Sequence, residues 1–140
     1  MYKKVLLPFS NKTHGQRSLK ALEHALALNP GEIILLHVTE PLPNIVGGEA
    51  RTELKKDECE KGQAILTPIL DALKRSGVSF HSRIEEGNPV ETIIRIAHEE
   101  GADIIVMFTD GRDGFSDMLI GSITERVLRQ TDIPLLAVRR

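Results

Sequence analysis

The chain has little of what several common protein classes require. It contains one cysteine, no tryptophan and an aromatic fraction of 4% in 140 residues. Because Cys59 is alone, an intramolecular disulfide and a multi-cysteine metal site are excluded. The few aromatic side chains leave little for a base-stacking surface, and a formal net charge of -2 argues against binding nucleic acid through its phosphates. We therefore expect no nucleic-acid partner.

Long apolar runs and familiar catalytic motifs are also missing. No stretch approaches the length of a membrane span, and residues 1–4 lead directly into a strand-like run rather than a signal-peptide core. This pattern predicts a cytoplasmic protein without membrane contact. The phosphate-binding pattern G-x-x-x-x-G-K-[ST], the dinucleotide pattern G-x-G-x-x-G, the elbow G-x-S-x-G and the zinc pattern H-E-x-x-H do not occur. We predict no catalytic residue and no metal-ligand set.

Short apolar runs typical of buried strands alternate with helical spacing along the whole chain. Strands are expected at 4–8, 33–38, 77–84, 102–107 and 133–138, and helices after Thr13, at 50–75, after Asn88 and at 121–130. Asn88 and Pro89 have the residue types of an N-cap and a first helical position, and Pro68 predicts a kink or break in the second helix. This order predicts one α/β domain, residues 1–140, with a parallel sheet and helices on both faces.

Two loops are candidates for a binding site, at 9–13 after the first strand and at 109–120 after the fourth. In such sheets ligands bind beyond the carboxyl ends of the strands, where the strand order reverses. A glycine-bearing loop before a helix N-terminus suits phosphate, because free backbone N–H groups and the helix dipole favour negative charge there. Gly121-Ser122 stands at such a place. The alternative is that Ser122-x-x-Glu125 is a capping box that serves the helix alone.

Several segments, taken together and in this order, resemble the universal stress protein family over nearly the whole chain. They are Tyr2 to Pro8, Leu36-His37-Val38, Gly87-Asn88-Pro89, Ala102 to Met107, Gly121-Ser122 and Pro134 to Val138. The resemblance implies a doubly wound five-stranded parallel sheet of order 3-2-1-4-5, the adenine nucleotide alpha hydrolase-like fold. In that order the reversal lies between the first and fourth strands, where both candidate loops emerge.

The resemblance also implies where a nucleotide would bind. Nucleotide-binding members carry G-x2-G-x9-G-[S/T], and Gly111 with Gly121-Ser122 matches all but the first glycine, where this chain has Phe108. Ser10 stands where such members tend to have an acidic residue that holds the ribose. The expected binding residues are Gly111, Gly121, Ser122, Ile123, Thr124, Pro8, Ser10, Val38 and Phe108. The expected ligand is ATP with Mg²⁺, its affinity weakened by Phe108 and Ser10.

Three hypotheses about function remain open at this stage. The first is a non-catalytic ATP-binding or sensing module of the stress response, and the second is a nucleotide-independent dimeric scaffold or signalling partner. The third is a slow ATP hydrolase, for which the only candidate groups are loop aspartates such as Asp110, Asp113 and Asp117. The resemblance implies a homodimer paired through Leu135 to Val138, and other protein partners are compatible with the first two hypotheses. His37 is expected to be a packed, hydrogen-bonded residue near the adenine side of the site.

Overall fold

The computed structural model describes residues 2–10, 15–109 and 122–139. Its elements are β1 (Lys4–Ser10), α1 (Gly15–Ala27), β2 (Glu32–Thr39), α2 (Gly48–Ser76), β3 (Ser79–Glu86), α3 (Pro89–Glu100), β4 (Ile104–Phe108), α4 (Ser122–Gln130) and β5 (Leu135–Val138). All pairings are parallel, and the strand order is β3-β2-β1-β4-β5. The predicted fold class and strand order are confirmed.

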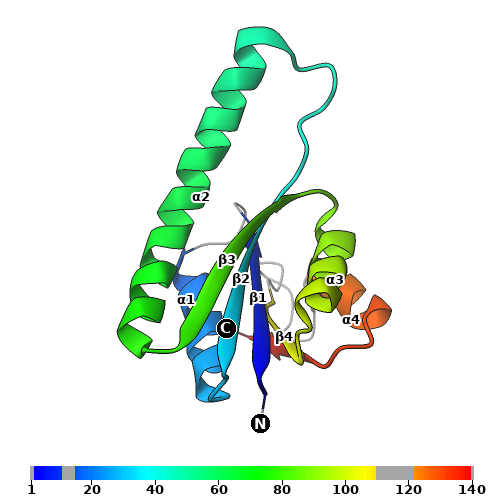
Figure 1. Cartoon of the computed structure of the whole chain (residues 1–140). Helices are drawn as coiled ribbons and strands as arrows, with labels where there is room; N and C mark the ends of the chain where they lie inside the picture. The colour runs from blue at the N-terminus through cyan, green and yellow to red at the C-terminus, as the bar shows by residue number, and fades with distance from the viewer. Residues whose placement is uncertain (1, 11–14, 110–121, 140) are drawn as a thin grey trace.

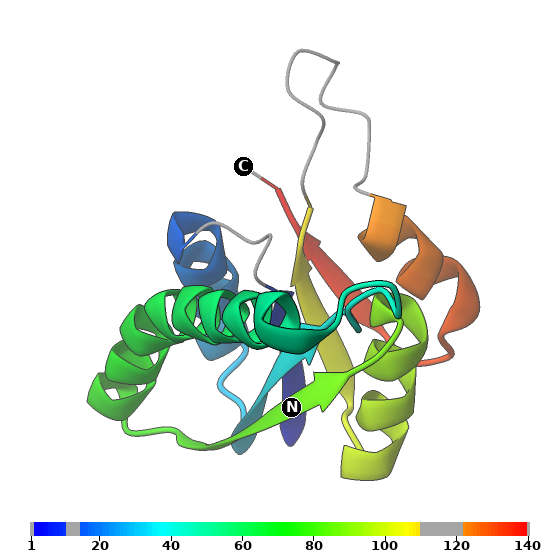
Figure 2. The ribbon, with the colours of Figure 1, turned by 90° about the horizontal axis from the view of Figure 1, so that it is seen from above.

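The sheet separates two hydrophobic clusters, and the alternation of side chains along each strand assigns residues to them. Figure 2 shows α1 and α2 on one side of the sheet and α3 and α4 on the other. Val5, Leu7 and Phe9 of β1 pack with α1 and α2, whereas Leu6 lies in the cluster formed with α3 and α4. This alternation decides which strand residues can reach a ligand on each side.

The helix α3 begins as the sequence predicts. The Oδ1 atom of Asn88 accepts hydrogen bonds from the backbone N–H groups of Val90 and Glu91, at 3.1 and 3.2 Å. Pro89 occupies the first helical position, where its missing N–H removes no bond. The start of α3 is thereby fixed next to the carboxyl end of the sheet.

The sequence predicts a kink or break at Pro68, and the break is wrong, because α2 runs without interruption from Gly48 to Ser76, a length of 29 residues. A proline in a helix interior removes one N–H donor and crowds the preceding turn, which together cost about 3 kcal/mol. Ile69 and Leu73, which are 1% and 0% exposed, follow it on the inner face, and each buried side chain contributes about 1.5–3 kcal/mol. Packing therefore outweighs the lost bond, and Figure 1 shows one long helix that extends beyond the sheet.

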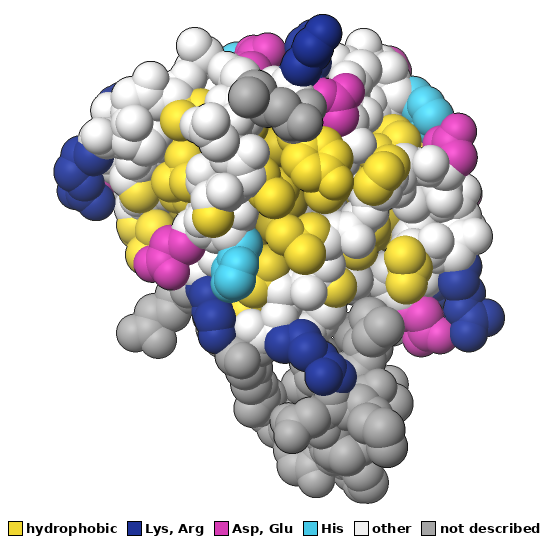
Figure 3. Space-filling model, turned by 90° about the horizontal axis from the view of Figure 1, so that it is seen from below, with side chains coloured by type: hydrophobic (Ala, Val, Ile, Leu, Met, Phe, Trp, Pro, Cys, Tyr) yellow, Lys and Arg dark blue, Asp and Glu magenta, His cyan; other side chains and the backbone are white. Residues whose placement is uncertain are grey.

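The two ends of the sheet differ. Figure 3 views the end at which the strands begin, where hydrophobic side chains gather at the centre and charged ones lie toward the rim. The far end of α2 extends beyond the opposite edge, where the strands end (Figure 1). No helix in the described part of the chain has the length and apolar character needed to cross a membrane.

Candidate binding site at the carboxyl end of the sheet

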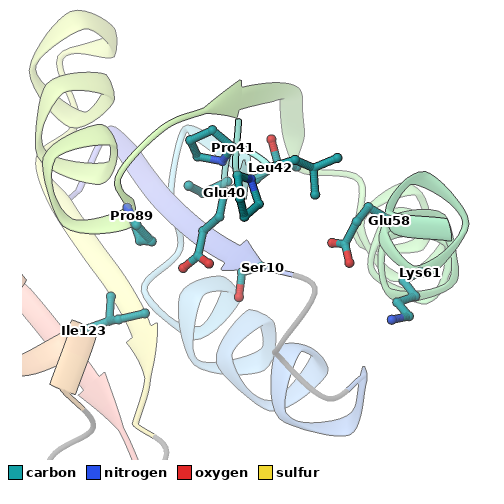
Figure 4. A pocket seen from close by; sticks show the side chains of 11 residues that line it. Ser10, Glu40, Pro41, Leu42, Glu58, Lys61, Pro89 and Ile123 are labelled. Atoms are coloured by element: carbon teal, nitrogen blue, oxygen red, sulfur yellow. The ribbon is translucent and has the colours of Figure 1, made fainter. Parts of the chain in front are cut away.

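A cavity of about 420 Å³ lies at the carboxyl ends of β1 and β2, close to the point where the strand order reverses. Figure 4 shows it from close by. It is lined by Ser10, Val38, Thr39, Glu40, Pro41, Leu42, Pro43, Glu58, Lys61, Pro89 and Ile123. It therefore combines residues from β1, β2, the loop after β2, and the three helices α2, α3 and α4.

The two strands contribute Ser10 and Val38, which are paired in register. Val38 belongs to the cluster that faces α3 and α4, and the alternation along β1 places Ser10 on the same face. Val38 is 3% exposed and gives the cavity an apolar wall. β1 extends to Ser10, two residues beyond the predicted strand, so this hydroxyl stands at the end of a paired strand. The structure thus brings together two of the predicted binding residues.

The start of α4 lies against the same cavity through Ile123. Ser122 is its first residue and is exposed, whereas Thr124 is buried and its hydroxyl donates a 3.5 Å hydrogen bond to the carbonyl of Phe108. This bond ties the first turn of the helix to the end of β4. The first turn of a helix has N–H groups without partners in the helix and the positive end of the dipole. An anion bound at this end of the cavity would be stabilised by both.

Among the residues that the structure describes, Phe108, Pro8 and Thr124 are predicted site residues that do not line the cavity. Phe108 packs against the cluster formed with α1 and α2, on the other face of the sheet from Val38. Pro8 pairs with Leu36 within the sheet, and the hydroxyl of Thr124 bonds to the backbone of β4. Gly111, Gly121 and the aspartates at 110, 113 and 117 lie outside the described residues.

The cavity also contains residues that the sequence argument did not select, namely Glu40, Glu58, Lys61 and Pro89. Glu58 and Lys61 reach it because α2 is much longer than the sheet. At about 1.5 Å per residue the helix spans about 43 Å, whereas β2 spans about 26 Å at about 3.3 Å per residue. The signal in the sequence was the charged run at 55–61, which reads as a solvated part of the helix expected at 50–75.

His37 lies in β2, within the packed sheet. It pairs with Phe9 in register, and the two rings stack with centroids 4.8 Å apart and 5° between their planes. Burial lowers the pKa of His37, and the nearby charge of Glu58 opposes this shift only in part. The imidazole is therefore neutral near pH 7, and its packing agrees with the expectation from sequence.

The parallel sheet with the order β3-β2-β1-β4-β5, together with a cavity close to the point where that order reverses, defines a doubly wound α/β domain of the adenine nucleotide alpha hydrolase-like class. The model of the universal stress protein family matches residues 1–139. The chain belongs to the universal stress protein family.

Individual relatives extend this comparison. Universal stress protein MJ0577 of Methanocaldococcus jannaschii is 31% identical over 156 residues, covering 100% of this chain and 96% of that protein. The solved structure of MJ0577 superposes with a TM-score of 0.81 at 34% identity, covering 100% of this chain and 97% of that one. A universal stress protein solved in complex with cAMP superposes with a TM-score of 0.70 at 25% identity, covering 98% and 97% of the two chains.

Proposed function

We propose that this chain is a cytoplasmic stress-response protein that binds an adenine nucleotide, with ATP and Mg²⁺ as the first ligand to test, and does not turn it over. The observation that carries the proposal is the cavity at the strand reversal, in which Ser10, Val38 and Ile123 meet. Its volume lies within the range of about 300–1,000 Å³ that is usual for small-molecule sites. A relative solved in complex with cAMP supports the choice of ligand class.

The lining of the cavity suits the parts of a nucleotide. Val38 and Leu42 give apolar surface for a base, and the start of α4 suits a phosphate. Binding without turnover is the simplest reading, because the sequence has none of the hydrolase or kinase motifs that would supply a catalytic group.

We also propose that the protein forms a homodimer through the free edge of β5. The N–H of Ile105 and the N–H of Thr109 donate to the carbonyls of Pro134 and Val138, at 2.9 and 2.8 Å. Since a strand residue directs its N–H and C=O to the same side, Leu135 and Ala137 direct theirs away from β4. An edge of this kind is a template for pairing with a second copy, which would satisfy these groups.

Isothermal titration with ATP and Mg²⁺ tests nucleotide binding, and released phosphate is measured in parallel. Ser122→Glu places a carboxylate at the first turn of α4, where it would repel a bound phosphate but favour the helix dipole. We expect binding in the micromolar range and a loss of at least about tenfold in the Ser122→Glu variant, because like charges in contact repel by several kcal/mol near a surface. Gln130→Glu adds the same charge at the other end of the same helix and serves as the control.

The outcomes separate the hypotheses. Wild-type protein that binds no nucleotide would leave the dimeric scaffold as the better account. Phosphate release above background that falls in the Ser122→Glu variant would replace the binding module by a slow hydrolase. Equal loss in the Ser122→Glu and Gln130→Glu variants would show that the phosphates do not lie at the start of α4.

A further inference from the structure

The cavity contains carboxylates although the position expected to supply one holds a serine. Ser10 stands at the end of β1, and a hydroxyl can hold only one of two neighbouring sugar hydroxyls well, whereas a carboxylate accepts from both. Glu40 and Glu58 also line the cavity, from the loop after β2 and from α2. Either could replace the missing acid, and the structure distinguishes between them.

The alternation of side chains along β2 and past its end places Glu40 on the same face of the sheet as Ser10. Val38 is paired with Ser10 and faces α3 and α4. Glu40 follows two residues later and precedes Pro41, and a residue before proline is restricted to extended conformations. The alternation of the strand therefore continues past Thr39, whose hydroxyl donates at 3.4 Å to the carbonyl of Glu85. Glu40 returns to the face of Val38, and Figure 4 shows its carboxylate turned toward the side of Ser10, Pro89 and Ile123.

Glu58 approaches from a different direction. It extends from α2, the helix that packs on the other face of the sheet, and its charge acts on the stacked ring of His37. Lys61 lies three residues further along the same helix, so the two side chains are neighbours of opposite charge. Figure 4 shows both on the α2 side of the cavity, away from Ile123.

The distribution of charge orients the ligand. Among the described residues that line the cavity, Glu58 and Lys61 lie at the α2 end, and the carboxylate of Glu40 lies between that end and Ile123 of α4 (Figure 4). The positive end of the α4 dipole favours phosphates at the start of α4, whereas the carboxylate of Glu58 disfavours them at the α2 end. The sugar of a nucleotide joins base to phosphate, so its hydroxyls must lie within reach of the α4 end. Glu40 meets this condition and Glu58 does not.

We infer that Glu40, assisted by Ser10, binds the 2′- and 3′-hydroxyls of the ligand's ribose, so that the site selects ribonucleotides over deoxynucleotides. This assignment rests on the proposed nucleotide site and makes it more specific. It gives Glu40 the role of a specificity-determining residue. Hydrogen bonds to an ionised carboxylate are among the stronger ones in proteins, and the loss of one weakens binding by about tenfold or more.

Titrations of ATP, 2′-deoxyATP and 3′-deoxyATP, each with Mg²⁺, test the assignment in wild-type protein and in the Glu40→Gln, Glu58→Gln and Glu86→Gln variants. Glu86 is exposed at the end of β3 and does not line the cavity, so Glu86→Gln is the matched control. We expect wild-type protein to prefer ATP to each deoxynucleotide by about tenfold, and the Glu40→Gln variant to bind all three alike. The Glu86→Gln variant should behave as the wild type does.

The other outcomes overturn the assignment in distinguishable ways. Wild-type protein that binds the three nucleotides equally would show that no carboxylate holds the hydroxyls, while leaving nucleotide binding intact. A preference that survives in the Glu40→Gln variant but is lost in the Glu58→Gln variant would assign the ribose to α2 instead. If no nucleotide binds to the wild type, the proposed function itself fails and the ribose assignment fails with it.

Discussion

Substitution of Ala137 by proline gives a direct test of the proposed dimer, because this residue directs its N–H away from β4. Proline at an edge strand removes an outward donor and no bond within the sheet. In a two-fold symmetric pair the donor is lost in both copies. Two hydrogen bonds of about 0.5–1.5 kcal/mol each amount to about 1–3 kcal/mol, or about 5- to 150-fold in the dissociation constant of the dimer.

Sedimentation over a range of protein concentrations measures that constant, and thermal unfolding followed by circular dichroism reports on the fold. Ala137→Ser keeps the backbone donor and should dimerise as the wild type does. Leu136→Pro should act differently, since its N–H faces β4 by the same alternation and its loss should lower stability. An Ala137→Pro variant that dimerises as tightly as the wild type would show that the edge of β5 is not the interface.

Four further predictions concern the fold and its titration. Phe108→Gly should lower the free energy of unfolding by up to about 3 kcal/mol and leave the affinity for ATP unchanged, because the partly buried ring packs with the α1 and α2 cluster. A gain in affinity for ATP would contradict this placement of the ring. Asn88→Ala should cost about 1 kcal/mol in urea unfolding by leaving two N–H groups of α3 without their acceptor, and Asn88→Asp should not. Burial lowers the pKa of His37, so its contribution to stability should fall as the pH drops below its ordinary value of 6.5, and His37→Gln should remove this part of the acid dependence of unfolding. Burial also acts to lower the pKa of His81, but its hydrogen bonds and charge interactions with Glu100 and Glu32 raise the pKa overall. The contribution of His81 to the stability of the fold should therefore be complete below pH 6.5 and should fall as the pH rises through the raised pKa. His81→Gln should abolish this part of the pH dependence of unfolding.

The sheet could be predicted from sequence because its signals are local. The buried runs of β1, β2 and β4 are almost wholly apolar, as strands covered on both faces must be. The start of α3 was equally clear, since Asn88 and Pro89 act within one turn. The strand order came from the resemblance to the family and not from any local pattern. The break expected at Pro68 does not occur, because the expectation used only the low helix propensity of proline and left out the packing of Ile69 and Leu73.

The sequence argument selected residues that line the cavity only where they follow strands or begin helices. Ser10, Val38 and Ile123 satisfy that condition, and the structure brings them to one cavity. Glu58 and Lys61 depend on where α2 lies relative to the end of the sheet, which no local pattern in the sequence gives. Phe108 was matched to a motif position by spacing alone, and its side chain packs on the other face of the sheet from Val38.

The role inferred for Glu40 is one way in which a site could keep its chemistry when one position of a motif changes. Ser10 ends β1 and Glu40 directly follows the adjacent strand β2, since Ser10 pairs with Val38 and Glu40 comes two residues later. A ligand beyond both strand ends contacts whichever side chain carries the carboxylate, so the requirement falls on the edge of the sheet and not on one position in the sequence. The proline after Glu40 disfavours helical backbone angles at that residue and so keeps its backbone extended. Loss of the acid at the end of β1 therefore does not by itself predict loss of ribose binding.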